Sequence, residues 1–447
     1  MNKGASVAVL LLIVLMIAAS ARAEELTLER AIEIALENNR SLQAAQYSAS
    51  ATDWGLGESI SVWLPHVYYN TTWMRPDQDT LDAADEALEM TRMYNPNAEP
   101  SLFEDNYSSS ISVVQPIFNG MREYATIHSA VVSRESAKLT AQDAKLQVSL
   151  EVKKAYYGAL SAKELVRVAQ ESLALAQQSL ALVKAQQDVG RVTVSDVLRW
   201  EAEAASAEGA VAEAENALAQ SRMALAQVVG EPVTTTYDLP EMNVEVDPQQ
   251  LLVAEDAALA GAQDQLSVGG HPAVQAEENN VTLAKIGTAE SVGALLPNVN
   301  FSYNYSWETN DTMAPDEDTS WTMGISVEIP LFQSFGAIGG IGRSCRTTQA
   351  TRMGAESYER TFLQRTYAAK LNLRAARLRV VSALKAKKHA AANLEIVNNR
   401  SELGMATNLE LLDAQLAYKN AQSNLIAAIS DFNTAMAEWE YVTAKAE

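Results

Sequence analysis

The sequence has few of the residues on which covalent or catalytic chemistry depends. Cys345 is the only cysteine among 447 residues, so no disulfide can form within one chain. The four histidines are isolated from one another, and no HExxH, GxSxG or P-loop pattern occurs. The sequence therefore gives no support to an enzyme, and we expect neither a catalytic residue, nor a metal site, nor a cofactor.

Long apolar runs are scarce as well. Residues 1–23 combine Lys3, an apolar stretch from Val7 to Ala19 and an Ala-Arg-Ala end, which is the pattern of a cleaved secretory signal peptide. Beyond it no run approaches the ~20 apolar residues that a transmembrane helix needs. An exported chain of this kind can still enter a membrane as a closed β-barrel.

Positive charge is also in short supply. The chain has 34 Lys and Arg against 56 Asp and Glu, a formal net charge of −22. A surface of that sign repels phosphate backbones, so nucleic acid is not an expected partner.

What the sequence does contain is a duplication. Around Pro116 it reads SVVQPIFNG, and around Pro330 it reads SVEIPLFQS. The offset between these two prolines, called the proline offset below, also relates DVGRVTVSDVL, which contains Gly190, to ELGMATNLELL, which contains Gly404. An ungapped match with proline and glycine landmarks indicates two structural repeats, which we place at residues 24–245 and 246–447.

A second landmark relates the repeats at a larger offset. Leu64-Pro65-His66-Val67 matches Leu296-Pro297-Asn298-Val299, and the distance between these two motifs is called the Leu-Pro offset below. Because this offset is larger than the proline offset, the first repeat carries extra residues between its two strands that the second repeat lacks.

Each repeat follows the same plan of a short helix, two strands, a very long helix and a returning helix. Proline closes the second strand of each pair, since it ends ladder pairing, and the repeat glycine ends the long helix. The expected elements are helix 26–58, strands 62–73 and 107–115, and helices 118–189 and 195–229, then helix 250–292 (interrupted near Gly269), strands 298–307 and 321–329, and a long helix to Gly404 followed by helix 408–442.

The long helices have coiled-coil periodicity. Apolar residues in the first alternate spacings of three and four, which is an a/d seam: Val166, Ala169, Leu173, Ala176, Leu180 and Val183. About 70 residues make a helix of roughly 105 Å, far longer than a globular helix. Such a helix has to lie against other helices along its whole length.

The strands alternate between apolar and polar residues. In NVNFSYNYSW (298–307) the aromatic residues fall at every second position, with Asn and Ser between them. Strands of about ten residues fit a tilted bilayer crossing, but four strands leave two open edges that hydrocarbon does not tolerate. Two copies would give an eight-stranded barrel filled by side chains, whereas three would give twelve strands, aromatics toward lipid and Ser and Asn toward water.

The segments between the strands are acidic. Residues 74–106 and 308–319 hold most of their charge as Asp and Glu. They could bind divalent cations, but no ligand spacing is evident, so we expect solvated loops.

Taken together, these features resemble the TolC-like outer-membrane efflux protein family. The resemblance rests on LTLERAIEIALENNRSLQAA (26–45), the LP-x-V strand starts, QPIFNG and IPLFQS at the strand ends, and the paired glycine turns. It implies a mainly α fold with a transmembrane β-barrel contribution, in which a homotrimer forms a 12-stranded barrel continuous with an α-helical coiled-coil tunnel.

The resemblance also implies a function. Such a protein is the passive exit duct of a tripartite efflux or type I secretion system. It sits among outer-membrane lipids, with its helices in the periplasm, and is joined by a periplasmic adaptor to an inner-membrane pump of the RND or ABC type.

The resemblance assigns roles to residues at the two helix tips. A pore constriction is expected from acids six and nine residues after the tip glycines, and adaptor docking from the tips themselves. The constriction residues are Asp196, Glu410 and Asp413, and the docking residues are Val189, Gly190, Leu403 and Gly404. In the best-known member of the family a Tyr and an Arg near the second tip pair across to the first, whereas this chain has Ser401 and Ala406 at those positions. We therefore expect another contact to hold the closed state.

Two other readings share part of this pattern. A periplasmic adaptor or other coiled-coil scaffold would share export, alanine-rich hairpins and acidity, but it would not need four alternating aromatic strands. An exported carbohydrate- or peptide-processing enzyme would need a catalytic constellation, which the sequence does not show.

Overall fold

The computed structural model describes residues 25–100, 102–235, 237–244, 268–310, 313–314, 319–333, 335–403 and 405–446. The predicted signal peptide, Gly404 and residues 250–267 of a predicted helix lie outside these ranges. The chain divides into two compact units. Met1–Tyr47, Lys138–Gln275 and Ser357–Glu447 form unit 1, and Ser48–Ala137 with Ala276–Glu356 form unit 2. Each unit draws on both halves of the sequence.

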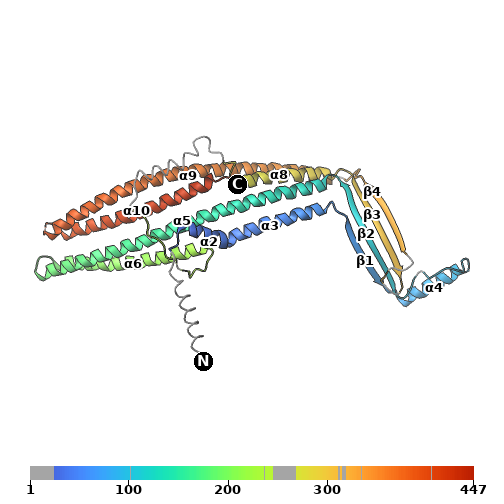
Figure 1. Ribbon diagram of the computed structural model, residues 1–447, viewed down its shortest axis with the longest axis horizontal. Helices are drawn as coiled ribbons and strands as arrows, with labels where there is room; N and C mark the ends of the chain where they lie inside the picture. The colour runs from blue at the N-terminus through green and yellow to red at the C-terminus, as the bar shows by residue number, and fades with distance from the viewer. Residues whose placement is uncertain are drawn as a thin grey trace, which may run out of the picture. The chain divides into compact units, whose positions relative to one another are not determined.

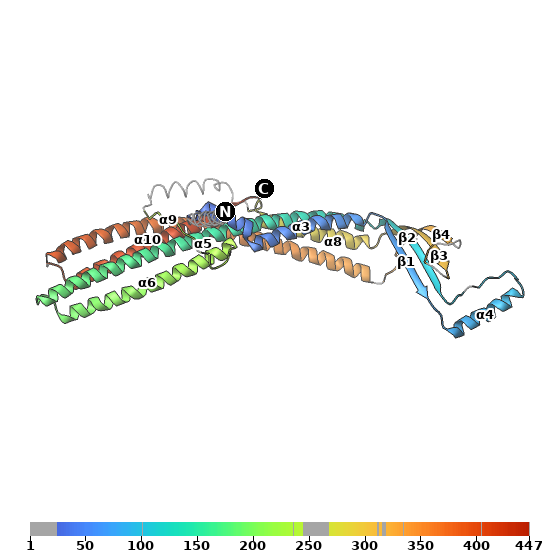
Figure 2. The ribbon, with the colours of Figure 1, turned by 60° about the horizontal axis from the view of Figure 1, so that its bottom comes forward.

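Unit 1 holds the greater part of two long antiparallel helix hairpins (Figures 1 and 2). One joins α5 (Arg122–Asp188) to α6 (Val194–Val229), and the other joins α9 (Gly336–Glu402) to α10 (Asn408–Thr443). The long helices have 67 residues each and the returning helices 36 each. These bounds agree with the prediction to within a few residues wherever the prediction gave an end.

The two hairpins of unit 1 pack through α5 and α10. Ser430 Oγ donates to the Tyr157 carbonyl at 3.3 Å, and Gln415 Nε2 donates to Ser179 Oγ at 3.1 Å. Seam residues Ala176 and Val183 are only 2% and 1% exposed. The predicted a/d seam is therefore a buried contact surface, which is what stabilises helices of this length.

One predicted helix is two helices. The prediction of a single helix over 26–58 is wrong because the chain breaks at Asn39, between α2 (Leu28–Asn38) and α3 (Arg40–Ser61). Asn39 Oδ1 accepts from the amides of Ser41 and Leu42 at 3.0 and 3.2 Å, and Asn39 Nδ2 donates to the Val228 carbonyl at 2.8 Å. The side chain caps the new helix and ties the break to the end of α6.

Unit 2 contains a four-stranded antiparallel sheet in the order β1-β2-β3-β4. Its strands are β1 (His66–Met74), β2 (Asn106–Asn119), β3 (Asn298–Thr309) and β4 (Thr319–Glu328). The unit also contains α4 (Gln78–Arg92), most of α8 (Pro272–Gly293), most of α3 (its residues 48–61), and the first parts of α5 (122–137) and α9 (336–356). β1 and β4 are the edges of the sheet, so the two halves of the sequence join at the β2–β3 pair.

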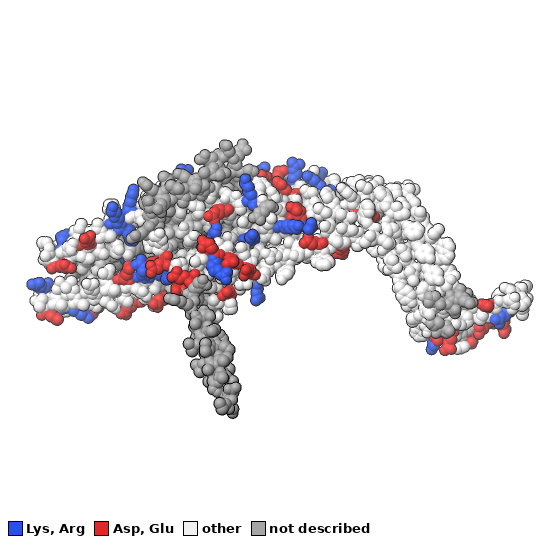
Figure 3. All heavy atoms as spheres, in the orientation of Figure 1, with Lys and Arg blue, Asp and Glu red and all other residues white. Residues whose placement is uncertain are grey.

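The register places like residues in rows across all four strands. One row is Tyr69, Ile111, Tyr305 and Trp321, and the adjacent row is Asn70, Ser110, Ser306 and Ser320. Because side chains alternate between faces, one face of the sheet is aromatic and aliphatic while the other carries hydroxyls and amides. On the side in view in Figure 3 the sheet is almost free of charged residues.

Pro116 does not end its strand as predicted. β2 continues to Asn119, with a register shift between Pro116 and Phe118. The ladder between β1 and β2 stops at the pair of His66, the first residue of β1, and Val114, so this part of β2 pairs with β3 alone. Because β1 does not reach Pro116, the missing N–H of this proline does not remove a hydrogen bond to β1. Pro330, in contrast, does follow the end of β4.

The segment 74–106 is not only loop. Its residues 78–92 form α4, which begins where Asp77 Oδ1 accepts from the Thr80 amide at 3.0 Å. No residue of α4 is buried. With 15 residues, this helix accounts for most of the extra length between the strands of the first repeat.

None of the helices within the described ranges combines the length and apolarity that a membrane crossing demands.

The join between α6 and the break at Asn39 gives a test of unit 1. Gly230 has φ +88°, and a Cβ there would lie 2.6 Å from the Asn38 carbonyl oxygen. We expect Gly230→Ala to destabilise the protein by about 2–4 kcal/mol, from left-handed strain and the clash together. Gly209→Ala, in the open interior of α6, should instead stabilise by about 1 kcal/mol. Unfolding midpoints of both variants would check this; equal midpoints would contradict it.

Candidate functional site: the tips of the two helix hairpins

Each hairpin turns at its tip through a short, matched segment. In the first, Gly190 has φ +74°, its amide donates to the Gln187 carbonyl at 2.8 Å, and the Arg191 amide donates to the Gln186 carbonyl at 2.9 Å. This is the Schellman ending that glycine permits. In the second tip the Met405 amide donates to the Arg400 carbonyl at 2.8 Å, which is the same bond at the duplicated position.

The returning helices begin with matched capping boxes. Thr193 Oγ1 accepts from the Asp196 amide at 3.3 Å, and the Asp196 carboxylate accepts from the Thr193 amide at 3.0 Å. At the second tip, the Glu410 amide donates to Thr407 Oγ1 at 3.2 Å, and the Glu410 carboxylate accepts from the Thr407 amide at 2.7 Å. Two of the predicted constriction acids are therefore also helix caps.

Capping holds both carboxylates in their charged form. Bonds from the hydroxyl and amide of Thr193 lower the pKa of Asp196, and contact with Asn408 adds to this. Bonds from the amide and hydroxyl of Thr407 lower the pKa of Glu410, and Arg400 contributes through its charge. Asp196 and Asn408 belong to different hairpins, so this contact joins the two tips.

Asp413 differs from the other two acids. It is exposed, and its carboxylate makes no hydrogen bond or ion pair with any of the residues that the structure describes. It lies three residues after Glu410, on the same helix face. Of the three predicted constriction acids, Asp413 is thus the one whose carboxylate is not used by a cap.

The tips also expose apolar side chains. Val189 is 69% exposed, and Leu403, its equivalent at the proline offset, is 72% exposed. Further exposed apolar residues surround them, namely Val194, Leu198, Met405 and Leu409. A cluster of exposed apolar residues on two adjacent turns is the usual mark of a protein-binding surface.

Behind the tips the hairpins share a small apolar core. It contains the fully buried Trp200 of α6, together with Val183, Val197, Leu394, Val397, Leu411 and Ala414. Ala406 packs against this core and Ser401 is 9% exposed. Where the resemblance led us to look for a polar latch at Ser401 and Ala406, the chain has apolar packing supplemented by the Gln415–Ser179 hydrogen bond.

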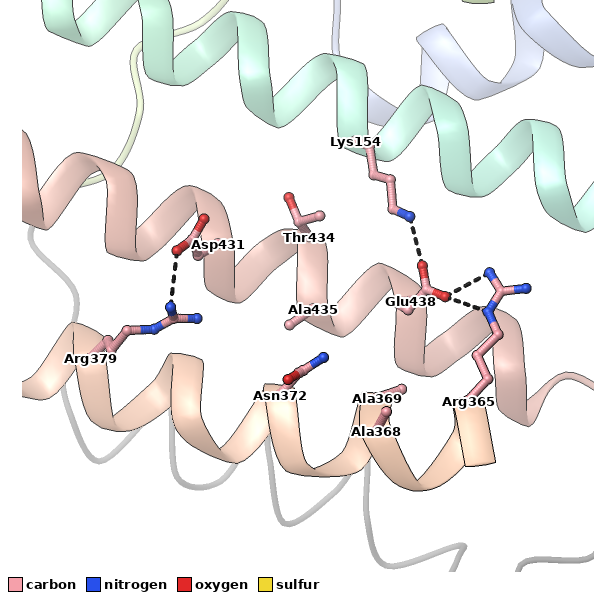
Figure 4. A pocket seen from close by; sticks show the side chains of 10 residues that line it. All are labelled: Lys154, Arg365, Ala368, Ala369, Asn372, Arg379, Asp431, Thr434, Ala435 and Glu438. Carbon is pink, nitrogen blue, oxygen red and sulfur yellow. Dashed lines mark hydrogen bonds and ion pairs between the residues drawn. The ribbon is translucent and has the colours of Figure 1, made fainter. Parts of the chain in front are cut away.

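A pocket of about 460 Å³ lies farther along unit 1, in the groove between α9 and α10 (Figure 4). Its cations are paired with acids of α10. Lys154 of α5 and Arg365 of α9 both contact Glu438, at 2.6 and 2.7 Å, and Arg379 lies 3.6 Å from Asp431. The pairs join three helices, so the charges of this groove stabilise helix packing.

No group of three or more His, Cys, Asp and Glu side chains in the described part of the chain is placed to hold a metal ion. In the first acidic segment, Asp105 instead pairs with Arg75 at 2.6 Å.

Sequence reasoning missed the threonines and the tryptophan of this site. Thr193 and Thr407 each stand three residues before an acid, which is the sequence signature of a capping box, so the signal was available. Trp200 could not be distinguished from other seam residues, because its burial depends on the second hairpin.

Comparison with known proteins agrees with this architecture. The chain matches the family described as "Outer membrane efflux protein" over residues 31–231 and 264–438. It is 28% identical to the outer membrane efflux protein BepC of Brucella suis over 171 residues, which are 38% of this chain and 35% of BepC. It is 23% identical to the alkaline protease secretion protein AprF of Pseudomonas aeruginosa over 353 residues, 75% of this chain and 69% of AprF.

Solved structures show the same fold. The outer-membrane channel OprN superimposes with a TM-score of 0.75 at 17% identity, covering 94% of this chain and 90% of OprN. The outer membrane protein VceC of Vibrio cholerae gives 0.74 at 16% identity, with 94% and 96% covered.

The chain belongs to the outer membrane efflux protein family. This confirms the resemblance and the predicted fold class. It also locates the protein in the outer membrane, with its helical part in the periplasm.

The capping boxes predict how the two tips respond to charge removal. Glu410→Gln and Asp196→Asn should each speed amide hydrogen exchange at the threonine of their own box at neutral pH, because a neutral side chain accepts more weakly. Asp413→Asn should leave both threonines unchanged. Since both capping carboxyls have lowered pKa values, wild-type protection should be present at neutral pH and lost as pH falls through those lowered values. Exchange that ignores the substitutions would contradict the caps.

Proposed function

We propose that this protein is the exit duct of a tripartite efflux or type I secretion system. Three copies would form a 12-stranded barrel and a helical tunnel. A periplasmic adaptor would join the helix tips to an inner-membrane pump of the RND or ABC type. The duct conducts passively and carries out no catalysis.

The observation that carries this proposal is the sheet of unit 2. Its two edges, β1 and β4, have no further strand partner among the described residues, and apolar side chains on both strands are largely exposed, with Val67 at 65% and Ile325 at 66%. Lipid can cover such a face, but it cannot satisfy the edge amides and carbonyls. Pairing β4 of one copy with β1 of the next satisfies both edges, and the hydroxyl and amide face then lines water.

Two tasks fit the same duct. The relative BepC is named for efflux and AprF for secretion of an alkaline protease. Secretion is the second candidate function, and the greater length of the match to AprF supports it. The pump and adaptor that co-purify with the protein would distinguish the two.

The acids of the second tip form the proposed constriction. If three tips converge on one axis, Glu410 and Asp413 of each copy make rings of like charge, which favour cations and hinder anions. Asp196 would add to this from the first tip. Asp413 should contribute most, because its carboxylate is not engaged by a cap.

Channel selectivity tests the constriction. In planar bilayers, Asp413→Ala should lower the preference for cations over anions several-fold and weaken block by multivalent cations, because a ring of charge is removed. Glu402→Ala is the matched control, because Glu402, the last residue of α9, is another exposed acid of the same tip. Unchanged selectivity in Asp413→Ala would remove this residue from the pore.

Docking at the tips has a separate test. Val189→Glu and Leu403→Glu should each weaken adaptor binding at least about tenfold, because an apolar side chain of this size contributes about 1.5–3 kcal/mol when buried. Binding of the purified adaptor to the detergent-solubilised channel would measure it. Both tip variants should retain their conductance in bilayers. As a control, Tyr94→Glu, on an exposed segment far from the tip in sequence, should bind the adaptor normally. Normal binding by both tip variants would rule out these residues as the docking surface.

A further inference from the structure

Within unit 2, helix α8 has a partner on each of two sides. On one side it meets α9, where Ser291 Oγ and Ser344 Oγ lie 2.6 Å apart. On the other it meets the start of α5, where Ser136 Oγ donates to the Ala276 carbonyl at 3.5 Å. The second contact is closest at Gly293, where a Cβ would lie 2.3 Å from the Gly120 carbonyl oxygen.

The duplication relates these helices to two others. α3 corresponds to α8 at the Leu-Pro offset, and α5 corresponds to α9 at the proline offset. α3 contacts α5 through the ion pair of Asp53 and Arg134, which matches the α8–α9 side. The equivalent of the α8–α5 contact would join α3 to α9. These two helices belong to opposite edges of the sheet, because α3 leads into β1 and α9 follows β4.

Both surfaces of that missing contact are exposed, whereas their equivalents in the existing contact are buried. Ile286 of α8 is 9% exposed, but its equivalent Trp54 on α3 is 83% exposed. Ala125 of α5 is 7% exposed, but its equivalent Gly339 on α9 is exposed. Trp54 is thus the exposed equivalent of a buried contact residue, and none of the described residues of its own chain covers it.

The existing contact also shows which residues would meet. Ile286 lies two helical turns before Gly293 on α8, and Ile127 lies two turns after Gly120 at the start of α5. Since the helices are antiparallel, these two positions are level with each other. Their equivalents are Trp54 and Ile341.

The residues around Ile341 are unusually small. Gly339, Gly340 and Gly342 flank it inside a helix, and a Cβ at any of the three would meet nothing within 4 Å. The equivalent residues of α5 are Ala125, Thr126 and His128. Glycine is a poor helix former, so three in four positions call for a packing reason. Compared with the existing α8–α5 contact, the larger Trp54 stands in place of Ile286 on one helix. On the other helix, glycines stand in place of Ala125, Thr126 and His128.

We propose that Trp54 of one copy packs into the glycine groove of a neighbouring copy, defined as Gly339, Gly340 and Gly342 on its α9. The partner is a second copy of this chain because the groove and Trp54 stand at opposite edges of one sheet, next to β4 and β1. This inference rests on the proposed assembly of several copies. It goes beyond strand pairing, since it assigns a specific helix–helix contact beneath the shared barrel wall.

Cysteine cross-linking of the full-length protein in detergent tests the contact. In a Cys345→Ala background, Trp54→Cys is combined with cysteine at position 339, 340 or 342. At least one pair should give covalent dimers and trimers on oxidation, because disulfides form only when Cα atoms approach within about 7 Å. Trp54→Cys with Gly354→Cys is the matched control, as Gly354 is an open glycine of the same helix about 18 Å farther along.

The outcomes separate the inference from the function on which it rests. If the purified protein is a trimer but does not cross-link at the groove, or cross-links equally at position 354, the proposed contact is wrong and the proposed function still stands. Particles of one chain overturn both.

A size-swap experiment gives a second readout. Gly339→Leu should lower the temperature at which the assembly dissociates, although leucine is the better helix former. Trp54→Ala in the same chain should recover part of that loss. Tyr94→Ala, at an aromatic residue that is even more exposed than Trp54, should leave the dissociation temperature unchanged. A Gly339→Leu protein that dissociates at the wild-type temperature would overturn the groove.

Discussion

The structure depends on one constraint: a sheet of four strands cannot satisfy its own edges. The outer edges of β1 and β4 have no strand partner among the described residues, and one face of the sheet is covered with aromatic and aliphatic side chains in register. In water such edges invite pairing with other chains, and in hydrocarbon an unpaired amide costs several kcal/mol. The remaining features of the protein are consistent with copies that share one wall.

The helices meet a related constraint. A helix of 67 residues has more apolar seam than a compact core can cover, so it is stabilised by neighbours along its length. Hydrogen bonds and ion pairs between α5 and α10 hold the two hairpins of unit 1 together. At the tips this packing ends in a small core around Trp200, while the capping acids and the exposed apolar residues remain at the surface.

Much of the fold could be predicted because the duplication places the same landmarks twice. Gly190, Pro330 and the period-two strand of NVNFSYNYSW each have a local physical reason that the sequence displays. Pro116 and Asn39 were predicted wrongly because their behaviour depends on partners. The strand passes through Pro116 because the ladder between β1 and β2 stops before that residue. The helix breaks at Asn39, whose side chain bonds to the Val228 carbonyl at the end of α6. The positions of Asp196 and Glu410 just after the tip turns could be predicted, and a threonine three residues before each acid already signalled the capping role that their hydrogen bonds show.

Amide hydrogen exchange on the protein in lipid or detergent tests the shared wall most directly. If copies pair β4 with β1, the amides of β1 and β4 that point away from β2 and β3 are as strongly protected as the amides of the two central strands. Rapid exchange of those outward amides, with β2 and β3 protected, would show open edges and would rule out a wall shared between copies.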